Sequence, residues 1–477
     1  MQTNQLLING KWVDAEAGGT IPIFNPNDGV QYGTLARGNS RDIDKAVAAA
    51  NEAFHGAWGK MPALEKGRLI ARLGQLVLDN EEELAHIEAN DVGKPLTQSR
   101  NDVKALARYC EFYAGAVDKT HGETIPYQSG YTVLTIREPF GVTAHIIPWN
   151  YPMQIIGRSV IGSLTAGNTV VIKPGEDASL TSLFFGRLAL EAGFPDGVIN
   201  IITGFGAEAG ASLASHQNVN HISFTGSSQV GALIQKAAAD NTVPVTLELG
   251  GKSPQLIFSD ADLEAALPMV VMAAIQNAGQ TCSAGSRVLV ESEIYDRFIT
   301  MLADRFNQLM VGPAEGDYDT GPLINPAQLE RVNGFLENRG DLEILARGSL
   351  AAEVPKSGYY TMPVLLGEVP PKHDLAQEEI FGPVLAAIRF SGEQEAIEIA
   401  NGTNYGLVAG VWTKDGARQF RLARALQSGQ VFINNYGAGG GVELPFGGVK
   451  GSGYGREKGL EALKGFSTLK TIAINHG

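Results

Sequence analysis

The chain has 477 residues, of which 44% are hydrophobic and 18% are charged, and its formal net charge is -14. This length exceeds that of a typical domain, about 100–200 residues, so we expect at least two domains with a cleft between them. The composition is typical of a compact folded protein and argues against disorder. The acidic balance gives no support to nucleic-acid binding, which favours a basic face.

Other features of the composition indicate a cytoplasmic protein. No run of about 18 apolar residues occurs, so no membrane-spanning helix is expected. The N-terminal residues 1–5 lack the basic and apolar regions of a secretory signal. Cys110 and Cys282 are the only cysteines, too few for a disulfide framework or a CxxC metal site. The histidines and acids do not cluster as ligands do, so we expect no metal.

Helical periodicity is the main signal in the first third of the chain. Apolar residues from Ile43 to Trp58 recur at helical spacing behind the candidate cap Ser40. The same spacing predicts helices around 69–77 and 103–113. Near 131–137 the apolar period changes to two, which predicts an extended strand or hairpin arm.

Short apolar segments then alternate with helices and Gly/Pro turns. The helix predicted over 179–192 ends at Gly193, with Pro195 beyond it. Such alternation predicts a buried parallel sheet that gathers ligands at the carboxyl ends of its strands. The predicted strands are 142–147, 169–172, 198–202 and 221–224.

A second series of apolar segments follows Leu249, again with helices between them. The sequence therefore predicts two α/β lobes joined near Gly250 and Gly251, plus an extended arm. The predicted strands of this second part are 255–258, 287–290, 386–390, 409–412, 431–434 and the final 469–474.

Cys282 lies in a small, polar segment, 277–285, between a predicted helix and a predicted strand. A structural cysteine has apolar neighbours on one face of an element, as Cys110 has. Gly279 and Gly285 would instead let a substrate and backbone N–H groups approach the sulfur. Composition alone leaves two interpretations, a nucleophile and a buried small hydrophobe.

Glu248 stands between leucines at the end of an apolar strand and is followed by two glycines. One interpretation is an acid that points into solvent from the strand end. The other is a general base, because a carboxylate among apolar groups has the raised pKa that a base needs.

Three further strand ends carry polar groups, and an ordinary exposed turn is the alternative for Lys173 with Glu176 and for the loop of Glu379. Ser227 follows a glycine turn and begins a helix, whose N–H groups could hold a phosphate. Lys173 and Glu176 could hold ribose hydroxyls. The Asn150 amide is a neutral donor suited to an oxyanion, and Glu379 lies in a further acidic loop.

Taken in order, these motifs resemble the aldehyde dehydrogenase superfamily, and the match runs essentially from end to end. The Glu248 and Cys282 motifs together are the most specific. The matching pieces are Pro148-Trp149-Asn150, Lys173-Pro174-Gly175-Glu176, Phe224-Thr225-Gly226-Ser227, 247–254, Gly279-Gln280-Thr281-Cys282, Glu379-Ile380-Phe381-Gly382-Pro383 and Pro445-Phe446-Gly447-Gly448.

The resemblance implies an α/β fold with a Rossmann-type cofactor-binding lobe, an α/β catalytic lobe and a β-strand oligomerisation arm. The NAD-binding domain would comprise 1–118 and 139–249, and the catalytic domain 250–446. The arm, 119–138 and 465–477, would build a homodimer or homotetramer.

The resemblance also implies NAD-dependent oxidation of an aldehyde to a carboxylic acid. Cys282 would attack the aldehyde carbon, the Asn150 side chain and the Cys282 N–H would hold the oxyanion, and Glu248 would activate water to hydrolyse the thioester. An acid near the adenosine ribose repels a 2′-phosphate, so we expect NAD rather than NADP. The residues expected around the cofactor are Lys173 and Glu176 (adenosine ribose), Trp149 and Ser227 (pyrophosphate side), Glu379 and Phe381 (nicotinamide riboside), and the glycines Gly226 and Gly250.

The sequence leaves the aldehyde itself open among semialdehyde, aromatic and aliphatic substrates. Arg158 resembles an arginine that binds the far carboxylate in semialdehyde dehydrogenases, although the position of a frequent second arginine holds Gln276. Alternatively, Arg158 pairs with a protein acid or faces another subunit. Tyr151 could add an aromatic wall, and the glycine-rich segment 436–442 implies a roomy mouth, without an aromatic cage for a trimethylammonium group.

Three other functions compete with hydrolytic oxidation. A CoA-acylating relative would transfer the thioester to coenzyme A and would need no base at Glu248. A thiol hydrolase would pair Cys282 with His145 or His221, but both lie on predicted core strands. A non-catalytic structural protein would need none of the three candidate catalytic residues.

Overall fold

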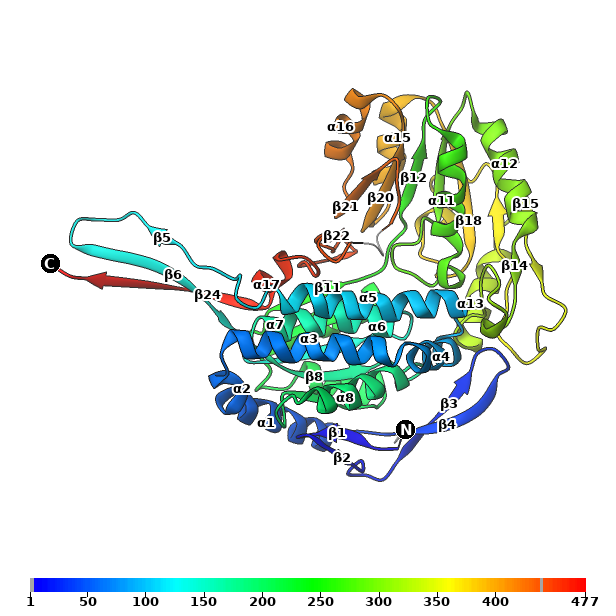
Figure 1. Ribbon diagram of the computed structural model, residues 1–477. Helices are drawn as coiled ribbons and strands as arrows, with labels where there is room; N and C mark the ends of the chain where they lie inside the picture. Colours follow the sequence, from blue (N-terminus) through cyan, green and yellow to red (C-terminus); the bar gives the residue numbers. More distant parts are fainter. Residues whose placement is uncertain (1–3, 438–440) are drawn as a thin grey trace.

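The structure is a computed structural model that describes residues 4–437 and 441–477. Its body consists of two α/β lobes, and an arm of β-strands projects from one of them (Figure 1). The N-terminal residues 1–5 were predicted to lack a secretory signal. Of these, residues 1–3 lie outside the described residues. Residues 438–440, inside the predicted glycine-rich mouth 436–442, lie outside them as well.

The chain begins with strands, although helices were predicted for the first third. Strands β1 (Leu6–Ile8) and β2 (Lys11–Val13) form a hairpin. Its turn is Asn9-Gly10, with φ of 52° and 71°. Asn-Gly is the residue pair that such two-residue turns prefer, so the sequence did carry a strand signal here. A second hairpin follows, β3 (Thr20–Asn25) with β4 (Val30–Ala36).

The helices predicted behind these hairpins are confirmed, with a correction at the first cap. Asn39, and not Ser40, is the N-cap. Its side chain accepts from the Arg41 N–H at 2.9 Å, and the Asp42 carboxylate accepts from the Asn39 N–H at 3.0 Å. This reciprocal capping box satisfies N–H groups that the first turn leaves free. The helices are α1 (Ser40–His55), α2 (Ala57–Lys60), α3 (Ala63–Asp79), α4 (Glu81–Val92) and α5 (Leu96–Ala114).

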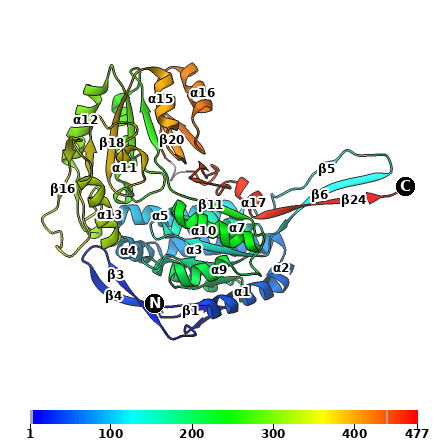
Figure 2. The same cartoon turned by 180° about the vertical axis from the view of Figure 1, so that it is seen from behind.

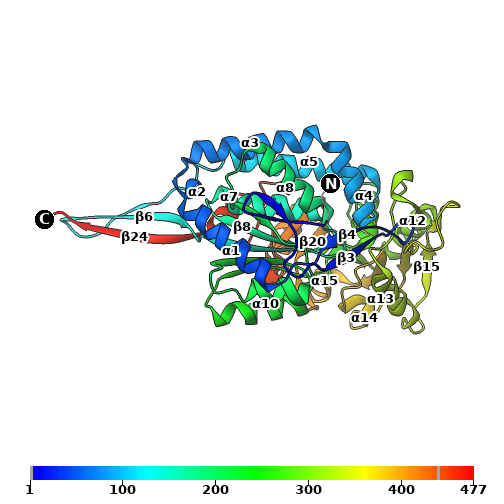
Figure 3. The ribbon, with the colours of Figure 1, turned by 90° about the horizontal axis from the view of Figure 1, so that it is seen from below.

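The first lobe is built on an eight-stranded sheet. Its five central strands, which in spatial order are β9, β8, β7, β10 and β11, run parallel to one another. Helices α3, α5 and α8 (Leu180–Ala192) cover one face, and α1, α9 (Ala211–Ala214) and α10 (Ser228–Asp240) cover the other (Figures 2 and 3). Burial on both faces explains why these strands are mainly apolar, and buried polar side chains on them, such as His145 and Ser223, have hydrogen-bond partners. The strand order is β2, β1, β9 (Ile199–Ile201), β8 (Thr169–Pro174), β7 (Val142–Ile147), β10 (His221–Thr225), β11 (Val245–Glu248) and β23 (Gly453–Tyr454).

The second lobe repeats the arrangement with its own sheet. Helices α11 (Leu263–Ile275) and α12 (Tyr295–Gln308) pack on one face. Helices α13 (Pro326–Glu337), α15 (Gly392–Asn401) and α16 (Gly416–Ala425) pack on the other. The strand order is β15 (Ile344–Arg347), β17 (Val364–Leu366), β18 (Val384–Phe390), β13 (Arg287–Glu291), β12 (Pro254–Ile257), β20 (Val408–Trp412) and β21 (Gln430–Ile433).

The arm consists of β5 (Thr124–Ile125), β6 (Tyr131–Pro139) and β24 (Ser467–Asn475). Strand β24 pairs antiparallel with β6 over its whole length. The arm extends away from the body, and the C-terminus lies near its tip (Figures 1 and 3). The strands predicted at 131–137 and 469–474 are therefore confirmed, and they come from distant parts of the chain.

Candidate active site

A cavity of about 530 Å³ is lined by both lobes and lies at the carboxyl edge of the first sheet. Its volume is within the usual range of small-molecule sites, about 300–1,000 Å³. Of the site residues predicted from the sequence, Lys173 and Glu176 lie outside its lining. The others line it: Trp149, Asn150, Tyr151, Arg158, Gly226, Ser227, Glu248, Gly250, Cys282, Glu379 and Phe381.

The order of the central strands brings these residues together. Strands β8, β7, β10 and β11 are successive neighbours and run parallel. Their carboxyl ends therefore share one edge. Lys173 and Glu248 lie at the ends of β8 and β11, Asn150 follows β7, and Gly226 follows β10.

A strained turn presents Cys282 to the cavity. The 3₁₀ segment Gln276–Gly279 contains Asn277 and Ala278 at φ of 50° and 54°, and Gly279 follows at 72°. Left-handed conformations of non-glycine residues are costly and cluster at functional sites. Burial raises the pKa of the Cys282 thiol to about 11, although the positive charge of Arg158 opposes the shift.

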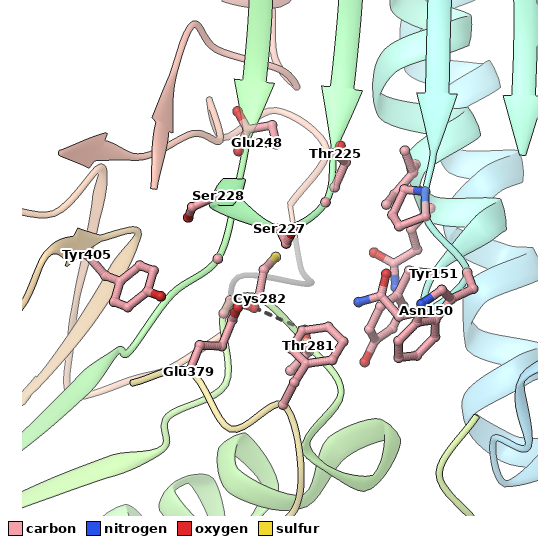
Figure 4. Close-up of a pocket in the computed structure, with 18 of the residues that line it drawn as sticks. Asn150, Tyr151, Thr225, Ser227, Ser228, Glu248, Thr281, Cys282, Glu379 and Tyr405 are labelled. Carbon is pink, nitrogen blue, oxygen red and sulfur yellow. Dashed lines mark hydrogen bonds between the residues drawn. The ribbon is translucent and has the colours of Figure 1, made fainter. Parts of the chain in front are cut away.

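Asn150 is fixed against the loop that carries the cysteine. Its side-chain N–H donates to the Gln280 backbone carbonyl at 2.9 Å, and its backbone carbonyl accepts from Asn277 Nδ2 at 3.1 Å. An amide nitrogen carries two hydrogens, so one donor is left for the cavity. Asn150 and Cys282 are drawn close to each other in Figure 4.

Glu248 is 1% exposed, and among the described residues neither carboxylate oxygen has a hydrogen-bond partner. Burial raises its pKa well above the usual value, Arg158 opposes the shift, and Glu457 adds to it. Gly447 leaves room for the carboxylate, since a Cβ there would lie 2.7 Å from Glu248 Oε1. A desolvated, unpartnered carboxylate facing a cavity has the character of a general base.

Arg158 lines the cavity and is ion-paired with a protein acid. It lies in the π-helical segment Ile156–Ile161, and its Nε is 2.6 Å from Glu457 Oε2. Its Nη2 donates to Thr225 Oγ1 at 3.1 Å. Of the two interpretations offered for Arg158, the pairing with a protein acid is what the structure shows. A substrate carboxylate would have to share this guanidinium with Glu457.

Opposite Asn150 and Tyr151, a second group of residues surrounds Cys282 (Figure 4). Ser227 caps α10 and accepts from the Val230 N–H at 3.3 Å. Because Ser227 and the first residues of α10 line the cavity, the helix N-terminus faces it. Such a terminus favours a phosphate. The Glu379 carboxylate accepts from the Gly251 N–H at 2.9 Å, and burial raises its pKa to about 7. The Phe381 ring stands edge-on to the Trp149 ring at 5.5 Å.

Lys173 and Glu176 form an ion pair of 2.8 Å where β8 ends. Lys173 is buried, and the Glu176 pKa is lowered because Lys173 outweighs the effect of burial. Glu176 also accepts from the Gly206 N–H at 3.5 Å. The pair lies on the same sheet edge as the cavity, one strand beyond β7.

Several cavity residues were not predicted from the sequence. Gln328 and Arg331 lie on α13 and bond to carbonyls of the Glu379 loop, Gln328 to that of Phe381 at 2.7 Å and Arg331 to that of Glu379 at 2.6 Å. No local motif marks them, because only the docking of α13 brings them there. Thr225, Thr281 and Phe446 also line the cavity and lie inside motifs already recognised in the sequence, whereas the other unpredicted lining residues are Gln154, Ile155, Ser228, Gln229, Ser283 and Tyr405.

The two histidines proposed as partners of Cys282 lie away from it. His145 Nε2 lies 2.9 Å from Thr143 Oγ1, and His221 Nε2 lies 3.2 Å from Thr246 Oγ1. Burial lowers the pKa of both to about 3, and neither lines the cavity. The geometry therefore provides no Cys–His dyad among the described residues.

Fold and cavity define a two-lobed α/β protein with a thiol, a buried carboxylate and a helix N-terminus around one cleft. The family model "Aldehyde dehydrogenase family" matches residues 12–472. Hydroxyisobutyraldehyde dehydrogenase of Mycolicibacterium austroafricanum is 42% identical over 98% of this chain and 93% of its own length. The chain belongs to the aldehyde dehydrogenase family.

Solved structures of similar proteins agree with this family membership. A 61% identical protein from Burkholderia cenocepacia has a TM-score of 0.99 and covers 99% of this chain and 100% of its own. The NAD⁺ complex of aldehyde dehydrogenase from Bacillus cereus has a TM-score of 0.96 at 38% identity, covering 99% and 96%. The predicted aldehyde dehydrogenase fold is thereby confirmed. Among the described residues, no helix is long and apolar enough to span a bilayer.

Proposed function

We propose that this protein oxidises an aldehyde to a carboxylic acid with NAD⁺, through a covalent thioester on Cys282. The observation that carries the proposal is the single cavity in which Cys282, Glu248 and Asn150 meet a capped helix N-terminus. Among the proteins compared, the Bacillus cereus structure is an NAD⁺ complex. Membership of the family supports the same reaction.

The residues of the cavity fit a dinucleotide. Gly250 keeps space clear, because a Cβ there would lie 2.3 Å from Glu379 Oε2. Ser227 and the α10 N–H groups would face the pyrophosphate, Lys173 and Glu176 the adenosine ribose, and Glu379 and Phe381 the nicotinamide riboside. When bound, NAD⁺ supplies the hydride acceptor.

In this mechanism the Cys282 thiol gives up its proton to solvent water and, as the thiolate, attacks the aldehyde carbon to form a thiohemiacetal. The free N–H of Asn150 and the Cys282 backbone N–H stabilise its oxyanion, and loss of one such donor typically costs about 3–4 kcal/mol of transition-state stabilisation. Departure of hydride leaves a thioester on Cys282. Glu248 then takes a proton from the water that attacks this thioester. The carboxylic acid is released, and the Cys282 thiol is regenerated.

Purified protein should reduce NAD⁺ in the presence of at least one of a panel of aldehydes, with acetaldehyde, benzaldehyde and succinic semialdehyde as representatives. Absorbance of the reduced cofactor measures the reaction. The signal should vanish in Cys282→Ala and persist in Cys110→Ala, since Cys110 is buried in the helical core. Full activity of Cys282→Ala would overturn the proposal, and a requirement for coenzyme A would establish the acylating alternative.

We further propose that the arm builds a homodimer or homotetramer. Tyr127, Leu469 and Ile474 on the arm are 64%, 54% and 48% exposed. A projecting sheet with apolar side chains in solvent is typical of an association surface. The two cysteines, both free in the structure, support the expected cytoplasmic location.

A further inference from the structure

A buried cluster of charges lies behind the wall of the cavity that carries Tyr151. Lys94 stands in the loop between α4 and α5 and is fully buried. Its ammonium is 2.5 Å from Glu88 Oε1 and 2.5 Å from Asp102 Oδ2. Glu88 is also fully buried and Asp102 is 4% exposed. Burying three ionisable groups together is costly, so an arrangement of this kind calls for a role beyond stability.

Two contacts connect the cluster to the cavity. The Lys94 ammonium lies 3.7 Å from the centroid of the Tyr151 ring, a cation–π contact in a desolvated setting. The second oxygen of Asp102, Oδ1, accepts from Gln154 Nε2 at 2.5 Å. Tyr151 and Gln154 both line the cavity. Each therefore has one side toward the cavity and a charged partner behind it.

These two contacts lie on the aldehyde side of the proposed site. Tyr151 directly follows Asn150 and is the N-cap of the short helix α6 (Pro152–Ile155). This helix carries Gln154. In Figure 4, Tyr151 and Asn150 stand on the side of Cys282 away from Glu379 and Tyr405. Glu379, one of the proposed nicotinamide residues, lies on that other side, so α6 faces the space left for the aldehyde.

We propose that the Lys94–Asp102 ion pair is a positioning device that fixes Tyr151 and Gln154 as the wall of the aldehyde pocket. The inference rests on the proposed function, because it assigns the substrate side of that same site. Asp102 acts through Gln154, and Lys94 acts through the Tyr151 ring. Release of either contact lets the wall side chain move away from its place, so the aldehyde loses its contact with the wall and Cys282 becomes more accessible; this weakens binding of the aldehyde and not of NAD⁺.

Glu88 offers a matched control. Burial raises the pKa of Glu88 well above its usual value, with Lys94 opposing the shift and Asp102 adding to it. Glu88→Ala and Asp102→Ala each remove one carboxylate from the same ammonium and leave it the other. Only Asp102 bonds to a cavity residue. A purely structural role of the cluster would affect both variants alike.

The test is a double-mutant cycle on Asp102 and Gln154, with Glu88→Ala as control. Asp102→Ala and Gln154→Ala should each raise the aldehyde KM about fivefold to tenfold, in keeping with a lost charge-assisted hydrogen bond. The KM for NAD⁺ should stay within twofold. The double variant should show no further rise, because the two residues act through one contact. Glu88→Ala should leave the aldehyde KM within twofold.

Equal effects of Glu88→Ala and Asp102→Ala on the aldehyde KM would overturn the proposal, and so would additive effects in the double variant. If Asp102→Ala does not fold, an unchanged aldehyde KM in Gln154→Ala overturns it by itself.

A second readout needs no turnover. The rate at which N-phenyl iodoacetamide alkylates Cys282 should rise in Gln154→Ala and Asp102→Ala and not in Glu88→Ala. Absence of this contrast overturns the inference even if the protein reduces no NAD⁺. Silence of the wild-type protein with every aldehyde would count against the proposed function alone.

Discussion

At the scale of single residues, Glu248 has the clearest electrostatic signature. The carboxyl group is buried without a hydrogen-bond partner among the described residues, so its protonated form is favoured. It can accept a proton from water only after it has lost its own. The hydrolytic step should therefore be faster at higher pH, because the pKa is raised and the carboxylate forms only as the pH rises through it.

We expect Glu248→Gln to separate the two halves of the reaction. The variant should still release a burst of about one reduced cofactor per Cys282, because thiol attack and hydride departure do not need the base. Steady-state turnover should fall about 10²–10⁴-fold, the usual contribution of a general base, and should lose its rise with pH. Rapid-mixing absorbance measures both phases. A steady-state rate equal to that of the wild type would remove Glu248 from the mechanism.

We also expect a single residue to decide cofactor choice. Glu176 is held by Lys173, and its pKa is lowered, so it carries a negative charge at neutral pH. In the proposed site this charge would repel a 2′-phosphate. The kcat/KM for NAD⁺ should exceed that for NADP⁺. Glu176→Gln should lower the ratio of kcat/KM for NAD⁺ to kcat/KM for NADP⁺ about tenfold, which corresponds to about 1.4 kcal/mol. The exposed Glu398→Gln serves as control, and an unchanged ratio in Glu176→Gln would contradict the assignment.

At the scale of elements, the turn before Cys282 is the most constrained part of the site. Three successive residues from Asn277 have positive φ. At Gly279 a Cβ would lie 2.2 Å from the Gly382 carbonyl oxygen, which belongs to the Glu379 loop. The thiol and the proposed cofactor loop are thus packed against each other through a glycine, and neither can shift alone.

Gly279→Ala should therefore lower both stability and activity. We expect a loss of about 2–4 kcal/mol in the free energy of unfolding, from the left-handed backbone and from overpacking together. Urea unfolding measures this loss, and kcat/KM for the aldehyde should fall in parallel. Gly334→Ala is the control, because Gly334 lies in α13 with open space around it. That change should stabilise the protein by about 0.5–1 kcal/mol, and equal effects at both positions would contradict this account.

At the scale of the whole molecule, the arm is the feature that one chain leaves unexplained. Strand β24 pairs with β6 from Ser467 opposite Pro139 to Asn475 opposite Tyr131, and it leaves apolar side chains in solvent. A second copy of the chain would cover them.

Leu469→Glu combined with Ile474→Glu should dissociate the assembly into smaller species in sedimentation velocity. Charges placed in an apolar interface remain unpaired there and are costly to desolvate. Phe420→Glu is the matched control, since Phe420 on α16 is 76% exposed but lies away from the arm. A monomeric wild-type protein, or an unchanged sedimentation coefficient in the double variant, would contradict the assignment.

Much of the fold was predicted from local sequence, because its signals are local. Mainly apolar segments such as 142–147 and 221–224 indicate strands buried on both faces, and Gly193 ends α8 in the left-handed conformation that favours glycine. The Asn9-Gly10 hairpin carried an equally local signal and was still missed. The hydroxyl of Ser40 favours a cap at that position, whereas in the structure the neighbouring Asn39 makes the capping bonds.

For the site, the sequence by itself determined which residues could carry chemistry, through motifs at the ends of strands and in the Cys282 loop. Only the tertiary structure decided which of them face one cavity and what stands behind them. The ion pair of Arg158 with Glu457, the docking of α13 and the contacts of the charged cluster with Tyr151 and Gln154 join residues that are far apart in the sequence. Such partners leave no local pattern, because the desolvation and hydrogen bonding that fix them exist only when the chain is folded.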